Sequence, residues 1–407
     1  MSDAIRLAAR LEQVSASQTQ QVLVAVERLR RQGVDVIDLG AGEPDFPTPD
    51  HVKTAAAVAI QDNFTKYTAG AGITELREAI AQHYADRYGV TYDTTSVVVT
   101  AGGKQALYNT AVALFGPGDE VITHVPGWPS IVEQIHLAGA EPVLVRTSAE
   151  EGFELRAGPV LEAVTPRTRG IVINSPGNPT GAVMRESELA LLADGLADRD
   201  IWVILDLCYE QLIYDDIPHN LPRVLWDRLA DRTVLVGTAS KSYAMTGWRC
   251  GWLLAPPAAA AGCNVVQSHS TSHATSISQH AALAALTGPQ VCVDTMRDEY
   301  RARRDAVLSW MDADRRFRVT RPAGAFYLFP DVSELLSVDG LRTSAQLVQT
   351  LLTDAHVAVT PGEAFDAPGF IRISYAAPMD QLREAWTRIQ RFLGSMTGAA
   401  QAPASQG

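Results

Sequence analysis

The sequence lacks any long apolar run. No stretch reaches the roughly 20 consecutive apolar residues that a membrane-spanning helix needs. Residues 1–13 (MSDAIRLAARLEQ) carry charge throughout and contain no apolar run of signal-peptide length. We therefore expect no membrane span and no secretory leader, and a cytoplasmic location.

Positive charge is also scarce. Lys and Arg number 34 against 46 Asp and Glu, which gives a formal net charge of −12. Proteins that bind nucleic acid need clustered cations to displace counterions from the phosphates, so a nucleic-acid partner is not expected. Hydrophobic residues make up 46% and charged residues 20% of the chain, a composition typical of folded globular proteins rather than disordered or fibrous ones.

Cysteine is rare and shows no pairing pattern. The four cysteines contain no Cys-x-x-Cys spacing, and they are Cys208, Cys250, Cys263 and Cys292. Buried reduced thiols are the simplest interpretation. His269 and His273 are four residues apart and could form a metal-binding pair on a helix, but no carboxylate or third ligand stands nearby. We predict no metal site.

What the middle of the chain does contain is a repeated pattern: a short β-branched run, a break at Gly, Pro or Asn, and a longer helical stretch. This alternation predicts an α/β fold, with a mostly parallel seven-stranded sheet and helices on both faces. Several runs are apolar at every position, as buried parallel strands are. The expected strands are 97–100, 120–124, 142–145, 170–174, 202–207, 233–237 and 251–254, and the expected helices are 104–114, 130–138, 186–197 and 289–312.

The pattern changes in the last quarter of the chain. Alternating strands are expected at FRVT, AFYLF, VAVTPG and FIRISYA, with helices over 344–355 and 379–393, which indicates a second, smaller α+β domain. The predicted division is an N-terminal segment (1–48) that joins the small domain, a large domain (49–288), the small domain (289–395) and a disordered tail of small and polar residues (396–407).

Chemically informative residues follow the carboxyl ends of several predicted strands, where open α/β sheets bind their ligands. Residues 100–104 (TAGGK) form a Gly-rich turn before a helix, whose free N–H groups could hold a phosphate. Asp206 ends another strand and could either cap a helix or pair with the protonated ring nitrogen of a heterocyclic cofactor. Lys241 follows the next strand among hydroxyl residues, and Arg249 comes shortly after it. These two residues predict a bound phosphate beside a reactive amine.

A set of motifs in a fixed order then gives the chain a family resemblance. The motifs are LGAGEPDFPTP (39–49), YTAGAGITELREAIA (67–81), TAGGKQALYN (100–109), NSPGNPTG (174–181), DLCYE (206–210), SKSYAMTGWRCGW (240–252) and IRISYA (371–376). The chain resembles the class I and II aminotransferases of fold type I, the aspartate-aminotransferase-like group, over nearly its whole length. The resemblance implies a pyridoxal-phosphate enzyme that moves the amino group of an L-amino acid to a 2-oxo acid by a ping-pong mechanism.

The resemblance also implies which residues act on the cofactor ring. Lys241 would bind pyridoxal phosphate covalently and then transfer the proton of the substrate's α-carbon, because a lysine out of water and near cations has a lowered pKa. Asp206 would keep the pyridine nitrogen protonated, which makes the ring an electron sink. Tyr209 and Asn178 would hydrogen-bond the ring's 3-oxygen, and Trp128 would stack on the ring face or, alternatively, serve only as a core aromatic.

Phosphate binding is implied for a second group of residues. It comprises the backbone N–H groups of Gly103 and Lys104, the hydroxyls of Thr238 and Ser240, and the guanidinium of Arg249. Tyr67 would reach the same phosphate from a partner subunit. The resemblance therefore implies a homodimer with shared active sites.

Substrate binding is implied for Arg372, which would hold the α-carboxylate bidentately, as the planar guanidinium allows. The alternative for Arg372 is a surface salt bridge, and its apolar neighbours favour the binding role. Gly42 would let the backbone come close to the substrate. Trp128 and Asn178 would also line the substrate side.

Two segments depart from the family pattern on that side. Many family members have Pro-Tyr-Trp where this chain has Pro126-Gly127-Trp128, and Pro-Ser-Ala-Thr where it has residues 16–19 (ASQT). Relatives that accept dicarboxylates or prephenate carry a lysine just before the second segment, whereas this chain has Ser15. A dicarboxylic substrate is therefore in question, and Lys66 is one basic residue that could substitute.

Other functions remain as alternatives. Lyases, cyclopropane-forming synthases and oxidases share the fold and cofactor, and no residue in the sequence enforces release of a 2-oxo acid. A DNA-binding regulator with an aminotransferase-like domain would need a further domain before the motif that begins at Leu39. A nicotinamide-dependent dehydrogenase would need G-x-G-x-x-G between a strand and a helix, whereas residues 40–42 (GAG) precede Glu-Pro.

Overall fold

The computed structural model describes residues 8–16, 18–337 and 341–399 of the chain. Ser17 of the segment 16–19, residues 1–7 of the N-terminal segment and residues 400–407 of the predicted tail lie outside the described residues.

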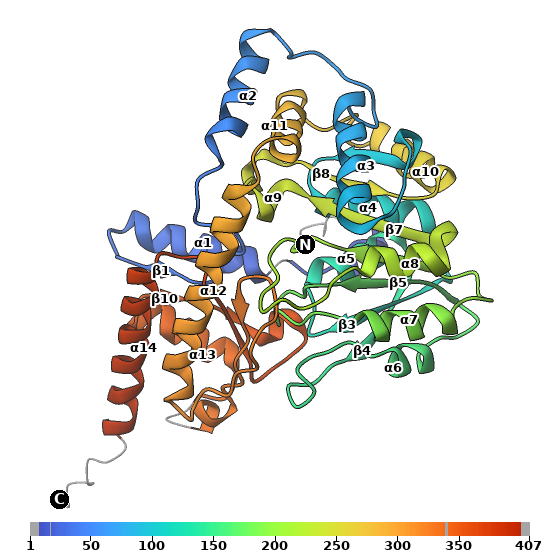
Figure 1. The fold of residues 1–407 in the computed structure, drawn as a ribbon. Helices are drawn as coiled ribbons and strands as arrows, with labels where there is room; N and C mark the ends of the chain where they lie inside the picture. The colour runs from blue at the N-terminus through green and yellow to red at the C-terminus, as the bar shows by residue number, and fades with distance from the viewer. Residues whose placement is uncertain (1–7, 17, 338–340, 400–407) are drawn as a thin grey trace, which may run out of the picture.

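A seven-stranded sheet forms the centre of the larger part of the molecule (Figure 1), with the strand order β2-β8-β7-β6-β5-β3-β4. The pairs among β3 to β7 are parallel, and β8 is antiparallel to both of its neighbours. The mostly parallel α/β sheet predicted from the sequence is confirmed. Its strands are β2 (Val97–Thr100), β3 (Glu120–Val125), β4 (Glu141–Arg146), β5 (Thr168–Asn174), β6 (Trp202–Asp206), β7 (Thr233–Thr238) and β8 (Gly251–Leu254).

Helices bury both faces of this sheet. Successive side chains of a strand point to opposite faces, so Ile171 and Ile173 of β5 join one hydrophobic cluster while Val172 joins another. This double burial explains why the central strands are largely apolar on both faces. The helices of this part are α2 (Asp50–Gln61), α3 (Thr74–Tyr88), α4 (Gly103–Leu114), α5 (Pro129–Ala138), α6 (Ala157–Glu162), α7 (Glu186–Gly195), α8 (Leu221–Leu229), α9 (Ala239–Ser242), α10 (Pro257–Ser268) and α11 (Ser276–Thr287).

The smaller part combines the two ends of the chain. Strand β1 (Ile37–Asp38) pairs in parallel with β10 (Val357–Ala358), and helix α1 (Gln18–Arg31) contributes Val26 to a small apolar cluster with Leu352 (Figure 1). The other elements of this part are α12 (Val291–Asp312), β9 (Tyr327–Leu328), α13 (Ser344–Asp354), β11 (Thr360–Pro361), β12 (Ile371–Ser374) and α14 (Met379–Ala399). Short 3-10 turns occur at η1 (Ala9–Glu12), η2 (Thr94–Ser96), η3 (Ala230–Arg232), η4 (Thr246–Trp248), η5 (Ser333–Ser337) and η6 (Gly362–Phe365).

Two predictions for this part were wrong in detail. The expected strand 317–320 contributes only an isolated bridge between Arg318 and Asp331, because the chain after it turns away at Pro322 and Ala323 donates its N–H to Gly181 instead. Helix α14 continues to Ala399, so residues 396–399, which were assigned to the tail, are helical.

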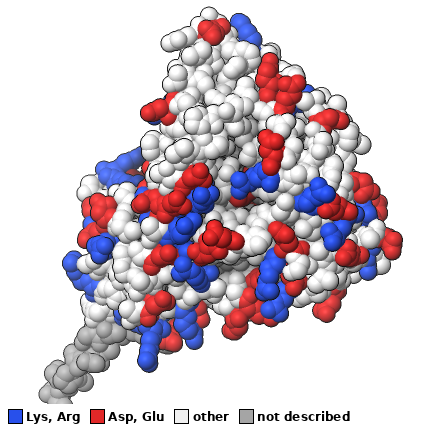
Figure 2. All heavy atoms as spheres, viewed as in Figure 1, with Lys and Arg blue, Asp and Glu red and all other residues white. Residues whose placement is uncertain are grey.

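The face in Figure 2 carries acidic and basic side chains interspersed over most of its area. The part formed by α2, at the top of the same view, is largely uncharged (Figures 1 and 2), and Val58 and Ile60 are exposed there. Within the described ranges, none of the helices is long and apolar enough to cross a membrane.

Candidate active site

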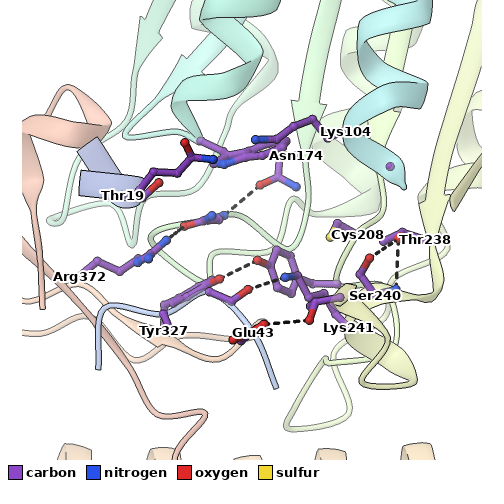
Figure 3. A pocket seen from close by; sticks show the side chains of 18 of the residues that line it. Thr19, Glu43, Lys104, Asn174, Cys208, Thr238, Ser240, Lys241, Tyr327 and Arg372 are labelled. Atoms are coloured by element: carbon purple, nitrogen blue, oxygen red, sulfur yellow. Dashed lines mark hydrogen bonds between the residues drawn. The ribbon is translucent and has the colours of Figure 1, made fainter. Parts of the chain in front are cut away.

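A cavity of about 360 Å³ lies where the carboxyl ends of the central strands meet the smaller part of the molecule. Segments from the whole length of the chain line it (Figure 3). Nearly all of the sequence-predicted site residues are among its lining residues: Gly42, Gly103, Lys104, Trp128, Asn178, Asp206, Tyr209, Thr238, Ser240, Lys241, Arg249 and Arg372.

One end of the cavity is rich in hydrogen-bond donors. The first backbone bond of α4 runs from the N–H of Gln105 to the carbonyl of Gly102 (3.0 Å), so the N–H groups of Gly103 and Lys104 belong to the free end of the helix. Arg249 lies against this turn, and a Cβ on Gly102 would come within 2.7 Å of its Nη2. The backbone at position 102 also has a φ of +88°, which residues with a side chain rarely adopt, so glycine is favoured there. The N-terminus of α4 and the guanidinium of Arg249 together favour the binding of an anion at this end of the cavity.

Hydroxyl groups complete this end. Thr238 ends β7 and caps α9, because its Oγ1 accepts the N–H of Ser240 at 3.1 Å. The hydroxyls of Thr238 and Ser240 are 2.8 Å apart (Figure 3). Both side chains are buried and line the same cavity as Arg249.

Asp206 lies deeper, at the end of β6. Its carboxylate accepts hydrogen bonds from Asn174 Nδ2 and from the backbone N–H of Cys208, both at 3.1 Å. Burial raises the pKa of Asp206 to about 7, although the Cys208 N–H and the charge of Lys241 act in the opposite direction. A buried carboxylate of this kind is suited to hold a cationic partner.

Lys241 stands on the single turn of α9 that follows β7. Burial lowers the pKa of its amine, and the charges of Arg372 and Arg249 lower it further, while Cys208 and Glu43 oppose the shift. The amine donates a hydrogen bond to the carbonyl of Gly42 (Figure 3). A lysine in this environment can supply a neutral amine, which is the nucleophilic and basic form.

Arg372 lies on β12 at the opposite side of the cavity. It is only 2% exposed, and its guanidinium donates to Asn178 Oδ1 (2.9 Å) and to the Gly40 carbonyl (2.6 Å). The guanidinium also lies over the ring of Tyr327 at 4.4 Å. Among the described residues, no carboxylate pairs with it and its buried Nε has no hydrogen-bond partner. The surface salt bridge considered for Arg372 is therefore wrong.

Gly42 approaches the same side chains. A Cβ on this residue would lie 2.9 Å from the hydroxyl of Tyr327, which itself is 2.8 Å from the hydroxyl of Tyr209. Because that tyrosine pair is buried, a larger residue at position 42 would have to displace it.

A second cation faces the cavity. Lys104 Nζ lies 4.9 Å from the centre of the Trp128 ring, a cation–π contact. Burial lowers the pKa of Lys104, and the neighbouring Arg249 lowers it further. No ion pair to Lys104 occurs in the part of the chain that the structure describes.

Several cavity residues were not predicted from the sequence, among them Asn174, Glu43 and Tyr327. Asn174 ends β5 in the same motif as Asn178, and its position at a strand end was a usable signal. Glu43 accepts a hydrogen bond from Thr246 at 2.9 Å and belongs to the motif at 39–49, which is a usable signal in the sequence. Tyr327 comes from a two-residue strand of the smaller part, and no pattern in the sequence connects it to the cavity.

Tyr67 is the one predicted site residue that lies away from the cavity. It is 90% exposed and makes an edge contact with His273. Neither Lys66 nor Ser15 lines the cavity. Lys66 is exposed, and the backbone N–H of Ser15 donates a hydrogen bond to Glu133. Where the chain is described, there is no group of three or more His, Cys, Asp or Glu that could hold a metal ion, and the four cysteines are free thiols.

Comparison with known proteins identifies the family to which a chain with this cavity is similar. The model of the family described as aminotransferase class I and II matches residues 34–389. An aspartate/prephenate aminotransferase of Cereibacter sphaeroides is 42% identical over 95% of this chain and 98% of its own length. An aspartate aminotransferase of Geobacillus stearothermophilus is 39% identical over 96% of this chain and 99% of its own. The solved structure of a Thermus thermophilus aspartate aminotransferase with maleate is similar with a TM-score of 0.90 at 40% identity, covering 95% of this chain and 100% of that one.

Proposed function

Since the chain belongs to the class I and II aminotransferase family, we propose that its amino donor is a dicarboxylic amino acid, with aspartate as the first candidate. The protein is a pyridoxal-phosphate-dependent aminotransferase of fold type I, which transfers an amino group between an amino acid and a 2-oxo acid. The proposal concerns its substrate, the roles of its residues and its assembly.

The observation that carries the proposal is the presence of two cations, Arg372 and Lys104, in one cavity. Two carboxylates on a substrate would pair with both, whereas a monocarboxylic amino acid would pair with Arg372 alone. Maleate, a dicarboxylate, accompanies the Thermus thermophilus enzyme in its solved structure. The absence of a lysine at position 15 then matters less, because Lys104 supplies a cation in its place.

The residues present fit pyridoxal phosphate. We assign the phosphate to the free helix end at Gly103 and Lys104, the hydroxyls of Thr238 and Ser240, and Arg249, a donor set suited to a dianion. Asp206 would hold the ring nitrogen. Tyr209 and Asn178 would hydrogen-bond the 3-oxygen, and Trp128 would lie on the ring face. When bound, the cofactor supplies an aldehyde that reacts with amines and a ring that withdraws electrons.

Lys241 is assigned the proton transfer. Its buried amine, with a lowered pKa, can accept the proton of the substrate's α-carbon and return it to the cofactor. Arg372 would hold the α-carboxylate through two parallel N–H bonds and so orient the carbon–hydrogen bond toward Lys241. Val22 and Leu23 of α1 line the cavity and would limit the access of water.

The donor class can be tested by absorbance. Single L-amino acids are added to the purified protein with its cofactor, and conversion of the lysine-bound band to the pyridoxamine band is followed. We expect aspartate to convert it and alanine to do so poorly, with no conversion in the Lys241→Ala variant. Efficient conversion by alanine and none by aspartate would contradict the dicarboxylic donor.

The role of Lys104 can be tested with a matched control. Lys104→Gln keeps the backbone N–H but removes the charge, and the loss of a charge-assisted hydrogen bond costs about 1.5–3 kcal/mol, so KM for aspartate should rise about 10- to 100-fold. The constants for a monocarboxylic donor should change little. Lys66→Gln removes an exposed lysine outside the cavity and should leave both unchanged. If Lys104→Gln raised KM equally for aspartate and for the monocarboxylic donor, the proposed role of Lys104 would be wrong.

We further propose a large domain (49–288) and a small domain (289–395), with the N-terminal segment 1–48 as part of the small domain. The pairing of β1 with β10 and the separate hydrophobic clusters support it. A homodimer is proposed because Tyr67, implied to bind the phosphate, is exposed away from the cavity of its own chain. The four free thiols suit a reducing compartment, so the cytoplasm is the proposed location.

A further inference from the structure

Asn174 connects two residues of the cavity through one side chain. It is 4% exposed and stands opposite Asp206 in the register of β5 and β6. Its Nδ2 donates to Asp206 Oδ2 at 3.1 Å, and its Oδ1 accepts the backbone N–H of Asn178 at 2.9 Å. Because an N–H can be accepted only by the oxygen of the amide, this second bond determines that the NH₂ group faces Asp206.

We propose that Asn174 is a positioning residue that keeps the Asp206 carboxylate ionised and directed at the ring nitrogen of the cofactor. The inference rests on the proposed role of Asp206. Asn174 acts through Asp206 and takes no proton itself, because an amide does not titrate in the range where proteins are folded.

The physical reason is the cost of a buried negative charge. Burial alone favours protonated Asp206, and its pKa of about 7 means that the neutral acid is abundant near neutral pH before the cofactor binds. A protonated acid cannot act as the anionic partner of a pyridinium. Two donors oppose protonation, the N–H of Cys208 and the NH₂ of Asn174, and only the second depends on a side chain.

None of the other side chains described around Asp206 replaces the NH₂ group of Asn174 as a donor to its carboxylate. Lys241 is the positive charge that lowers the pKa of Asp206, and its amine is engaged by the Gly42 carbonyl. The thiol of Cys208 has a pKa raised to about 12, so it adds no negative charge near neutral pH. His124 accepts the backbone N–H of Asn174 at 3.3 Å, and burial lowers its pKa to about 4, so it is neutral there.

The test uses holoenzyme loaded with pyridoxal phosphate that carries a nitrogen isotope label in its ring. Nitrogen NMR separates the protonated from the neutral ring. The Asp206→Asn variant gives the resonance position of the neutral ring. The Asn174→Leu variant removes the NH₂ donor and keeps a side chain of similar volume. We expect the Asn174→Leu resonance to move from the wild-type position toward that limit, and the dissociation constant of the cofactor to rise about tenfold, as expected for a lost bond to a charged group.

Asn109→Leu is the matched control, since Asn109 is a buried asparagine that bonds to Gln267 and makes no contact with Asp206. Its ring resonance should equal that of the wild type. A wild-type resonance in Asn174→Leu, even with weaker cofactor binding, would show a merely structural role and overturn the inference. If that variant does not fold, Asn174→Ala is judged by the same criterion. A wild-type resonance in Asp206→Asn would instead refute the proposed role of Asp206 itself.

Discussion

Asp206 and Lys241 show how burial at a single residue produces chemistry. The same loss of water raises the pKa of the acid to about 7 and lowers that of the amine, since each shift favours the neutral form. Such shifts reduce the stability of the protein when no ligand compensates the buried groups, and they are common where groups must exchange protons. The cofactor would supply the missing charge partner for Asp206.

This cost predicts a pH-dependent stability for the cofactor-free protein. The pKa of Asp206 rises from 3.8 to about 7 on folding, so the folded state binds more protons between those values and its stability falls as pH rises through them. Asp206→Asn removes the charge and should stabilise the cofactor-free protein above pH 7, by at most about 4 kcal/mol. Denaturant unfolding of both proteins at a series of pH values measures this difference in the free energy of unfolding. The gain should vanish below about pH 4, and a gain independent of pH would contradict the shift.

Arg372 leads to a second prediction at this scale. Arg372→Lys retains the positive charge but loses the parallel pair of donors, so KM for the amino donor should rise by about 10- to 100-fold. The dissociation constant of the cofactor should stay near the wild-type value, because Arg372 lies on β12 at the side of the cavity opposite the donor-rich end. Steady-state kinetics and cofactor titration separate the two effects. An unchanged KM would count against carboxylate binding by Arg372.

At the scale of elements, the packing of β7 against its neighbours places Thr238, Ser240 and Lys241. Gly237 precedes them, and a Cβ there would lie 2.2 Å from Trp252 Nε1 on β8 and 2.5 Å from the Tyr84 hydroxyl on α3. The absence of a side chain allows strand and helix to approach closely. The end of β7 thereby acquires a defined position relative to the cavity.

Gly237→Ala should therefore lower the free energy of unfolding by about 1–3 kcal/mol through overpacking. Gly158→Ala in α6 is the matched control, because nothing lies within 4 Å of its added Cβ. That change should stay within about 0.5 kcal/mol of the wild type or stabilise the helix slightly. Chemical denaturation of both variants gives the comparison, and equal stabilities would mean that β7 and its neighbours can move apart freely.

At the scale of the whole molecule, the exposed Tyr67 and the uncharged surface over α2 in Figure 2 are consistent with a partner subunit. Val58 and Ile60 of α2 are 46% and 54% exposed. Exposed apolar side chains on an uncharged area favour association. The proposed homodimer assigns this area to a second copy of the chain, whose Tyr67 would then serve the cavity of this molecule.

Subunit complementation tests this assembly. Lys241→Ala and Tyr67→Ala chains, produced together, should form mixed dimers in which one site has both native residues. Such a mixture should contain sites with wild-type cofactor affinity and turnover, whereas we expect Lys241→Ala alone to be inactive and Tyr67→Ala alone to bind the cofactor weakly. Cofactor titration and activity assays detect these sites. A mixture that behaves as the average of its parents would rule out shared sites.

The sequence by itself determined the secondary structure of the central sheet and about half of the residues that line the cavity. The reasons are local: apolar runs bounded by Gly and Pro predict buried parallel strands, and Asp206 and Lys241 stand directly after two of them. The short strands of the smaller part were predicted less well, because pairs such as β1 and β10 depend on residues more than 300 positions apart.

Only the tertiary structure decided how distant side chains meet. Local patterns do not indicate that Tyr327 contacts Tyr209, that Asn174 turns its NH₂ group to Asp206, or that the amine of Lys104 lies beside the ring of Trp128. They also do not give the burial that shifts the pKa of Asp206 and Lys241. Burial and contact depend on the packing of all elements together, whereas a motif records only which residues are neighbours along the chain.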